Sequence, residues 1–166
     1  MSSKSKKSGM KIDRTLVVVD LENLCGGSDL IECCHRAASA VLKDLVGEGT
    51  VNYVIATGPS AREDTPDLPF DWPRARWLVG HGVDGADEEL VDVLLREPAA
   101  VHSQRVVIVS GDHRFASALH HLACNGVETT VVSRKTALSR ESRLAAKRVV
   151  TIPDFVSANH LPLEAA

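Results

Sequence analysis

Long apolar runs and aromatic side chains are both scarce in this chain of 166 residues. No run approaches the roughly 18 consecutive apolar residues that a membrane-spanning helix needs, and the opening MSSKSKKSGMK lacks the apolar stretch of a secretory signal. We therefore expect a cytoplasmic protein. Aromatic residues make up 4% of the chain, which excludes an extended platform for stacking nucleic-acid bases.

Cysteine pairs with metal-binding spacing are missing as well. The four cysteines include no C-x-x-C pair, and the adjacent Cys33 and Cys34 are poorly placed to form a disulfide with each other. The segment Cys33–His35 falls in a helical pattern, in which consecutive side chains point in different directions, so it is disfavoured as a metal site. We expect reduced and mostly buried thiols.

Neither sign of charge dominates, since 19 Lys and Arg stand against 22 Asp and Glu, for a net charge of -3. The charges are segregated, however: residues 84–97 hold six acids and one base, and residues 134–148 hold six bases and one acid. With 44% hydrophobic and 25% charged residues the composition is that of a globular protein. We expect a disordered basic arm over residues 1–13, one domain over 14–156 and a short tail over 157–166.

Apolar strands alternate with amphipathic helices along the domain. The β-branched runs and helical spacings predict strands at 15–19, 51–56, 76–79, 105–109, 128–132 and 149–152, and helices at 28–46, 85–96, 113–125 and 138–147. Four prolines in residues 57–74 predict a long loop there. This alternation is typical of the α/β class, as a three-layer α/β/α sandwich on a mostly parallel central sheet.

Acidic residues follow two of the most apolar strands. Asp20 ends the first strand, Asp112 follows the fourth, and Asp84 and Asp87 stand at the start of the helix between them. Ligands bind at the carboxyl ends of parallel strands, so we expect these carboxylates to converge there. Each one alone could simply cap a helix. Together they repel one another unless a cation intervenes, and carboxylates favour Mg²⁺ or Mn²⁺, which serve phosphoryl transfer.

Three segments resemble the motifs of one family, in order and in spacing. Val18–Leu24 (VVDLENL), Gly85–Asp92 (GADEELVD) and Val107–Phe115 (VIVSGDHRF) are similar to the three motifs of the NYN domain, a group of PIN-like nucleases. The resemblance implies a PIN-like, Rossmannoid fold and a ribonuclease that uses Mg²⁺ or Mn²⁺. Its implied site consists of Asp20, Asp87 and Asp112 as catalytic metal ligands, Asn23 and Ser110 as residues that orient water or phosphate, and Asp84 and Asp92 as possible additional acids.

One position departs from the family pattern. Arg114 stands where the third motif commonly has a second Asp, so an acidic group is lost and a cation that could contact phosphate is gained. Arg134 and Lys135 follow the fifth strand and are therefore expected, with Arg114, to contact single-stranded RNA. Phe70 and Trp72 could stack on bases, cap the core or meet a partner.

Two other functions compete with the nuclease. A catalytically inactive RNA-binding or assembly module would keep the fold without turnover, and Arg114 motivates that alternative. A small phosphohydrolase of the haloacid dehalogenase-like type also has an Asp after its first strand. Glu22 would be its second acid, but a matching Lys is missing from its usual context. A homodimer formed through residues 58–74 or through exposed helix faces is a further possibility.

Overall fold

The computed structural model describes residues 13–47 and 49–155. Apart from Asp13, the predicted basic arm and the tail at 157–166 lie outside these residues. The centre of the fold is a six-stranded sheet in which every pair of neighbours is parallel, in the order β3-β2-β1-β4-β5-β6. The strands are β1 (Arg14–Asp20), β2 (Thr50–Thr57), β3 (Arg76–Val79), β4 (Arg105–Val109), β5 (Glu128–Arg134) and β6 (Arg148–Ile152).

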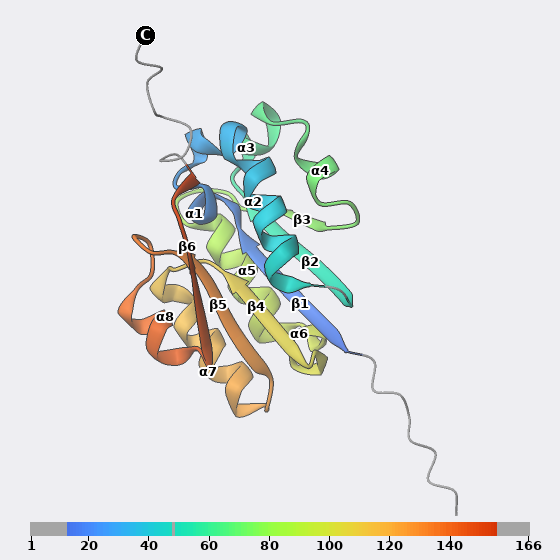
Figure 1. Ribbon diagram of the computed structural model, residues 1–166, viewed down its shortest axis with the longest axis vertical. Helices are drawn as coiled ribbons and strands as arrows, with labels where there is room; N and C mark the ends of the chain where they lie inside the picture. Colours follow the sequence, from blue (N-terminus) through green and yellow to red (C-terminus); the bar gives the residue numbers. More distant parts are fainter. Residues whose placement is uncertain (1–12, 48, 156–166) are drawn as a thin grey trace, which may run out of the picture.

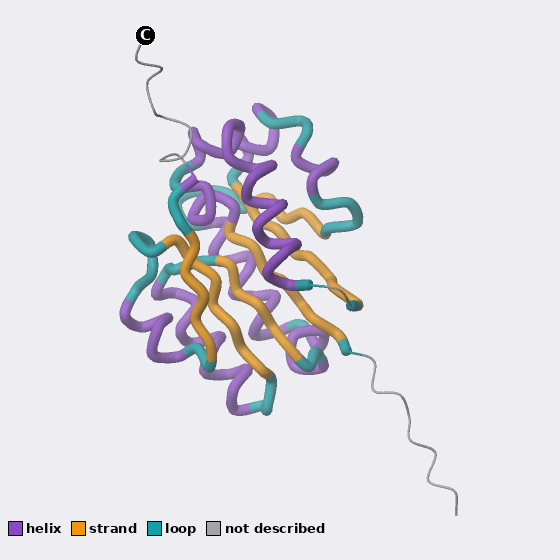
Figure 2. The backbone as a smooth tube through the Cα atoms, viewed as in Figure 1, coloured by secondary structure: helices purple, strands orange, loops and turns teal. Residues whose placement is uncertain are grey.

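Helices cover both faces of the sheet, so the predicted α/β/α sandwich is confirmed (Figures 1 and 2). Between β1 and β3 the chain forms α1 (Leu21–Cys25), α2 (Ile31–Val46), α3 (Pro59–Asp64) and α4 (Leu68–Asp71) on one face. Between β3 and β6 it forms α5 (Gly85–Arg96), α6 (Pro98–His102), α7 (Ala116–Cys124) and α8 (Arg140–Ala145) on the other. Short 3-10 turns at Ser28–Leu30 and His113–Phe115 precede α2 and α7.

The two cores follow from the alternation of side chains along β1. Val17 and Val19 pack under α2, whereas Leu16 and Val18 pack under α5 and α7. All four side chains are buried, which explains why β1 reads as a continuous apolar run in the sequence. The direction of winding reverses between β1 and β4, and this neighbouring pair is therefore the point where a ligand site is expected in such a sheet.

The prediction of a loop over residues 57–74 is wrong in part, because α3 and α4 lie within it. Pro59 and Pro69 stand in the first turns of these two helices, where a proline costs no hydrogen bond because the N–H has no partner inside the helix. Trp72 is 1% exposed and belongs to the core, so it cannot stack on a base. Its ring meets the half-buried Trp77 edge to face, and Phe70 is 81% exposed.

Among the described residues, no helix is long and apolar enough to cross a membrane. The predicted strands are all present, within one or two residues of the expected bounds. The helix predicted at 138–147 is shorter, because Ser139 caps it and its backbone turns extended again at Ala146. The short helices α1 and α6 were not predicted, since five residues give too little periodicity to be read from a sequence.

Candidate metal-dependent nuclease site

Asp20 is the most buried of the predicted acids, with 4% of its surface exposed. It is the last residue of β1 and caps the helix that follows: the backbone N–H of Asn23 donates to its Oδ1 at 3.0 Å. The hydroxyl of Ser110 donates to its Oδ2 at 2.9 Å. Parallel pairing of Val19 with Val109 brings Ser110 beside Asp20, so the register of the sheet sets this contact.

The segment after β4 is held from several sides. The backbone N–H of Gly111 donates to Oδ1 of Asn23 at 3.1 Å, and that of Asp112 donates to the hydroxyl oxygen of Ser110 at 3.2 Å. A Cβ on Gly111 would lie 2.2 Å from the carbonyl oxygen of Ala137, so only glycine fits. Asn23 and Ser110 thus join Asp20 and the backbone of Gly111 and Asp112 in one hydrogen-bonded network, and their expected role in orienting water or phosphate stays a prediction.

The third acid reaches the site from the start of α5. Gly80, directly after β3, lies so close to Gly85 and Ala86 that a Cβ on it would lie 2.1 Å from backbone atoms. This contact fixes the first turn of α5 against the sheet and directs Asp87 toward Asp20. Asp84, with a left-handed φ of 63°, lies just before the helix and lines the same cavity.

The two central carboxyl groups perturb each other. Burial, together with the negative charge of Asp87, raises the pKa of Asp20 from 3.8 to about 8, against the lowering effect of its bonds from Asn23 and Ser110. Burial also raises the pKa of Asp87, with a further contribution from Asp112, while contacts with Asp20 and Arg114 lower it. Neighbouring carboxyl groups with raised pKa values are typical of functional sites.

These groups surround an open cavity of about 300 Å³. Most of the predicted site residues line it, namely Asp20, Asn23, Asp84, Asp87, Asp112 and Arg134. Glu22, which the sequence analysis did not assign to the nuclease site, also lines it and accepts a hydrogen bond from the backbone N–H of Gly58 at 2.9 Å. The position of Glu22 in the sequence, two residues after the end of β1 and so at the same edge of the sheet, could have indicated that it lines the cavity.

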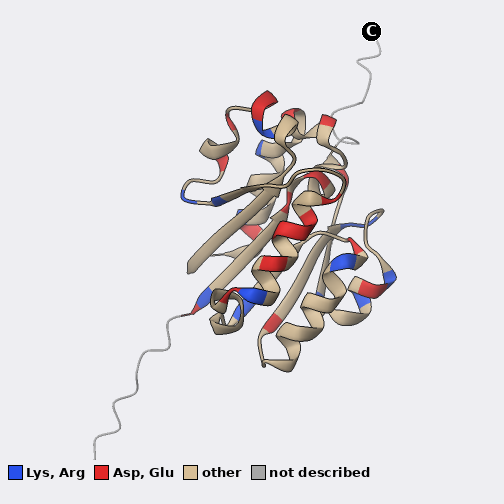
Figure 3. Cartoon of the chain, turned by 180° about the vertical axis from the view of Figure 1, so that it is seen from behind, with Lys and Arg blue, Asp and Glu red and all other residues tan. Residues whose placement is uncertain are grey.

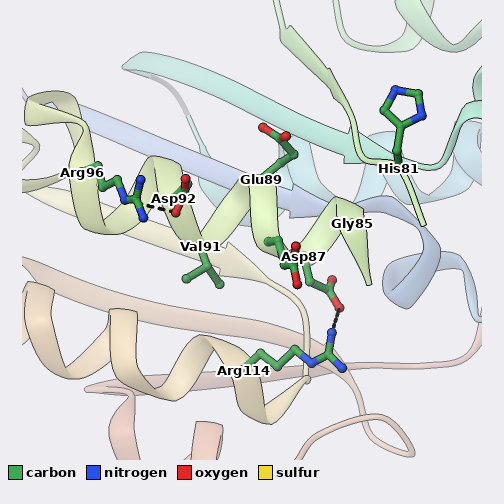
Figure 4. Close-up of a pocket in the computed structure, with 9 residues that line it drawn as sticks. His81, Gly85, Asp87, Glu89, Val91, Asp92, Arg96 and Arg114 are labelled. Carbon is green, nitrogen blue, oxygen red and sulfur yellow. Dashed lines mark ion pairs between the residues drawn. The ribbon is translucent and has the colours of Figure 1, made fainter. Parts of the chain in front are cut away.

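Asp92 is not part of this cavity. It lies further along α5, pairs with Arg96 at 3.3 Å and lines a larger cavity of about 570 Å³, which adjoins the first at Gly85 and Asp87 (Figure 4). The expectation that Asp92 is an additional, outer acid of the site stays a prediction, and the structure places Asp92 beside Asp87 and Arg114 in the lining of the larger cavity. The helix rotates its side chain away from Asp20, because five residues separate Asp92 from Asp87 along α5.

The predicted RNA contacts lie in three different settings. Arg114 turns toward the acids: its Nη2 lies 2.5 Å from Oδ2 of Asp84 and its Nη1 lies 3.7 Å from Oδ2 of Asp87. Arg134 donates to the carbonyl of Asn23 at 2.9 Å and pairs with Asp154 at 2.6 Å. Lys135 is exposed on the turn after β5.

The donor set suits a hard divalent cation in type and in burial. Carboxylate oxygens from Asp20, Asp87 and Asp112 face one cavity, and the proximity of the first two leaves a negative charge that a cation would neutralise. As the side chains stand, no group of three or more His, Cys, Asp or Glu within the described residues is arranged to hold a metal ion. The Arg114 guanidinium instead pairs with two of the acids.

The comparisons with known proteins agree with this geometry. A crystal structure of a protein of unknown function from Vibrio parahaemolyticus superposes with a TM-score of 0.64 over 88% of this chain and 96% of that one, at 15% identity, and thus shares the fold. None of the curated proteins compared with the chain matches it. The NYN domain matches residues 14–153, which include every strand and every acid of the cavity. The chain therefore belongs to the NYN domain family, within the PIN-like nuclease superfamily.

Proposed function

We propose that this protein is a divalent-metal-dependent ribonuclease that hydrolyses phosphodiester bonds of single-stranded RNA. The observation that carries the proposal is the convergence of three acids, Asp20, Asp87 and Asp112, from three separate connections onto the β1/β4 edge of the sheet. Membership of the NYN family supports a nuclease-like function at that edge. The nature of the donors favours Mg²⁺ or Mn²⁺.

Asp20, Asp87 and Asp112 would hold the divalent ion, which would supply Lewis acidity and an activated water for attack on the phosphate. The chain's own residues do the positioning. The Asn23 N–H and the Ser110 hydroxyl fix the two oxygens of Asp20, and with them the direction in which its carboxylate faces the cavity. Asp112 faces the same cavity, where its carboxylate can accept a hydrogen bond from an attacking water.

A basic surface next to the acids suits an RNA backbone. The Ser142 hydroxyl of α8 donates to the carbonyl of Asp112 at 2.6 Å, so this helix packs directly against the acidic segment. Exposed cations lie on α8 and on the turn before it, at Lys135, Arg140 and Arg143. The exposed side of α5 instead carries acidic residues along the helix (Figure 3). RNA would therefore approach from the side of α8, because α5 repels phosphate.

The test is hydrolysis of labelled single-stranded RNA by the full chain with Mg²⁺ or Mn²⁺, beside a sample in EDTA. We expect cleavage that EDTA abolishes and that Asp20→Asn and Asp112→Asn each reduce at least a hundredfold. Asp44→Asn is the matched control, since Asp44 is exposed on α2. Equal cleavage by the Asp20→Asn variant and the wild type would trace the activity to a contaminant and refute the site.

A second function is favoured by one specific observation. The ion pairs of Arg114 with Asp84 and Asp87 neutralise part of the acidic cluster without any metal, as suits an RNA-binding module that lacks turnover. The same experiment separates the two functions. Folded protein that binds RNA but leaves it intact with either metal would support the module, and metal-dependent cleavage would exclude it.

A further inference from the structure

The positively charged guanidinium of Arg114 lies among the acidic side chains of the site. The residue belongs to the short turn between β4 and α7, and its backbone N–H donates to Oδ1 of Asp112 at 2.8 Å. From there its side chain crosses to α5, where the two nitrogens Nη2 and Nη1 approach Oδ2 of Asp84 and Oδ2 of Asp87. Figure 4 shows the guanidinium at the end of the larger cavity, directed at α5.

A divalent ion held by Asp87 would share the carboxylate group of that residue with Arg114. The ion would take a carboxylate oxygen of Asp87, and Arg114 already lies 3.7 Å from Oδ2 of that residue. Two cations that share one carboxylate repel each other, and the repulsion is stronger in a partly buried site than in water.

The guanidinium can leave without disturbing the backbone. Its side chain is 35% exposed, and the hydrogen bond that anchors the residue is made by the main chain. A phosphate group offers a guanidinium a bidentate, charge-assisted partner of at least the same quality as Asp84. An RNA phosphate at the cavity would therefore draw Arg114 away from the acids and leave their oxygens free for the ion.

We propose that Arg114 is an internal counter-ion that weakens divalent-metal binding in the free protein and is withdrawn by an RNA phosphate, so that metal and RNA bind cooperatively. The inference rests on the proposed function and makes Arg114 a positioning residue of that site. Because linkage is reciprocal, the factor by which RNA tightens the metal equals the factor by which the metal tightens RNA.

The first measurement is Mn²⁺ binding to the free full-length chain, followed by electron paramagnetic resonance of the unbound ion. We expect Arg114→Gln to bind Mn²⁺ at least about tenfold more tightly than the wild type, which corresponds to about 1.4 kcal/mol. Arg114→Lys keeps the charge and should stay within about threefold of the wild type. Arg96→Gln is the matched control, because Arg96 pairs with Asp92 away from the Asp20 cavity.

The second measurement repeats the titration with a short single-stranded 2′-O-methyl phosphorothioate oligonucleotide, which resists hydrolysis. We expect the oligonucleotide to tighten Mn²⁺ binding to the wild type several-fold and to change binding to Arg114→Gln less than twofold. A melting curve for each variant, followed by circular dichroism, verifies that the fold is intact. This linkage is a readout that a purely structural role for Arg114 would not produce.

The outcomes separate this inference from the proposed function. Equal Mn²⁺ affinities of the wild type and Arg114→Gln, with metal-dependent cleavage retained, would refute the role of Arg114 as a counter-ion. The proposed nuclease function would be unaffected. Tighter binding by Arg114→Gln with no effect of the oligonucleotide on the wild type would refute the withdrawal by phosphate. If neither protein bound Mn²⁺, both the counter-ion and the metal-dependent nuclease would be refuted.

Discussion

Replacing Asp20 by Asn, which does not ionise, should stabilise the protein at neutral and alkaline pH while it abolishes the proposed activity. In the folded chain the pKa of Asp20 is raised to about 8, whereas the unfolded chain binds this proton with the ordinary value of 3.8. Between these values the folded state holds the proton and the unfolded state does not. The free energy of unfolding therefore falls as pH rises from about 4 to about 8.

The size of the effect follows from the same two values. At 1.36 kcal/mol per pH unit, the penalty reaches an upper bound of about 4 kcal/mol at pH 7 and about 6 kcal/mol above pH 8. Asn at position 20 carries no such penalty. Its amide group, however, replaces the oxygen that accepts from the Ser110 hydroxyl, at a cost of about 1–2 kcal/mol. We expect Asp20→Asn to be about 1 kcal/mol less stable than the wild type at pH 4 and up to about 4 kcal/mol more stable at pH 8.

The assay is urea denaturation in EDTA at pH 4, 6 and 8, followed by the fluorescence of the buried Trp72 and by circular dichroism. Asp44→Asn serves as the control for removal of a surface charge. The difference between Asp20→Asn and the wild type should change sign between pH 4 and pH 8. A constant difference across that range would refute the assignment of the raised pKa to Asp20, and so the account of the buried carboxyl pair.

Three further predictions concern the frame around the site. Gly111→Ala should cost about 3 kcal/mol of stability, because the new Cβ would meet the Ala137 carbonyl oxygen at 2.2 Å; a loss below about 1 kcal/mol in urea denaturation would contradict the crowding. Arg134→Ala should lower the free energy of unfolding by about 2 kcal/mol, because its hydrogen bond to the Asn23 carbonyl is lost, and Arg134→Lys should restore only part of that stability. Full recovery of stability by Arg134→Lys in urea denaturation would show that the planar guanidinium group is not required. Trp72→Ala should lower stability by about 4 kcal/mol and Phe70→Ala by less than about 0.5 kcal/mol, and similar losses in thermal melts would refute their different burial.

The sequence was sufficient to predict the sheet and the acids because both follow from short-range patterns. Continuous β-branched runs predict buried parallel strands, and the rule that ligands bind at strand ends points directly to Asp20 and Asp112. Asp87 was assigned as a metal ligand and Asp84 only as an additional acid because the helical pattern begins at Gly85, and the structure places Asp87 in one cavity with Asp20. Both residues nonetheless line the cavity.

Long side chains and short helices were beyond the reach of the sequence. The guanidinium of Arg114 could have faced solvent, phosphate or the acids, and the start of α5, 30 positions earlier in the chain, decides among them. Arg134 finds Asp154 twenty positions later, across the strand β6 that no local pattern ties to it. The helices α3 and α4 were missed because their prolines, which break a helix interior, here open a first turn.

The strand order bears on the stage of folding at which Asp87 approaches Asp20. Asp20 closes the first strand, but Asp87 arrives on the connection that leaves β3 at one edge of the sheet and returns to set β4 beside β1. If strands β1, β2 and β3 pair before that return, the early stages of folding proceed before Asp87 approaches Asp20. The unfavourable interaction between the two carboxyl groups then forms only when the connection from β3 through α5 to β4 is completed. Relief of the charge in Asp20→Asn should therefore appear as slower unfolding rather than as faster folding.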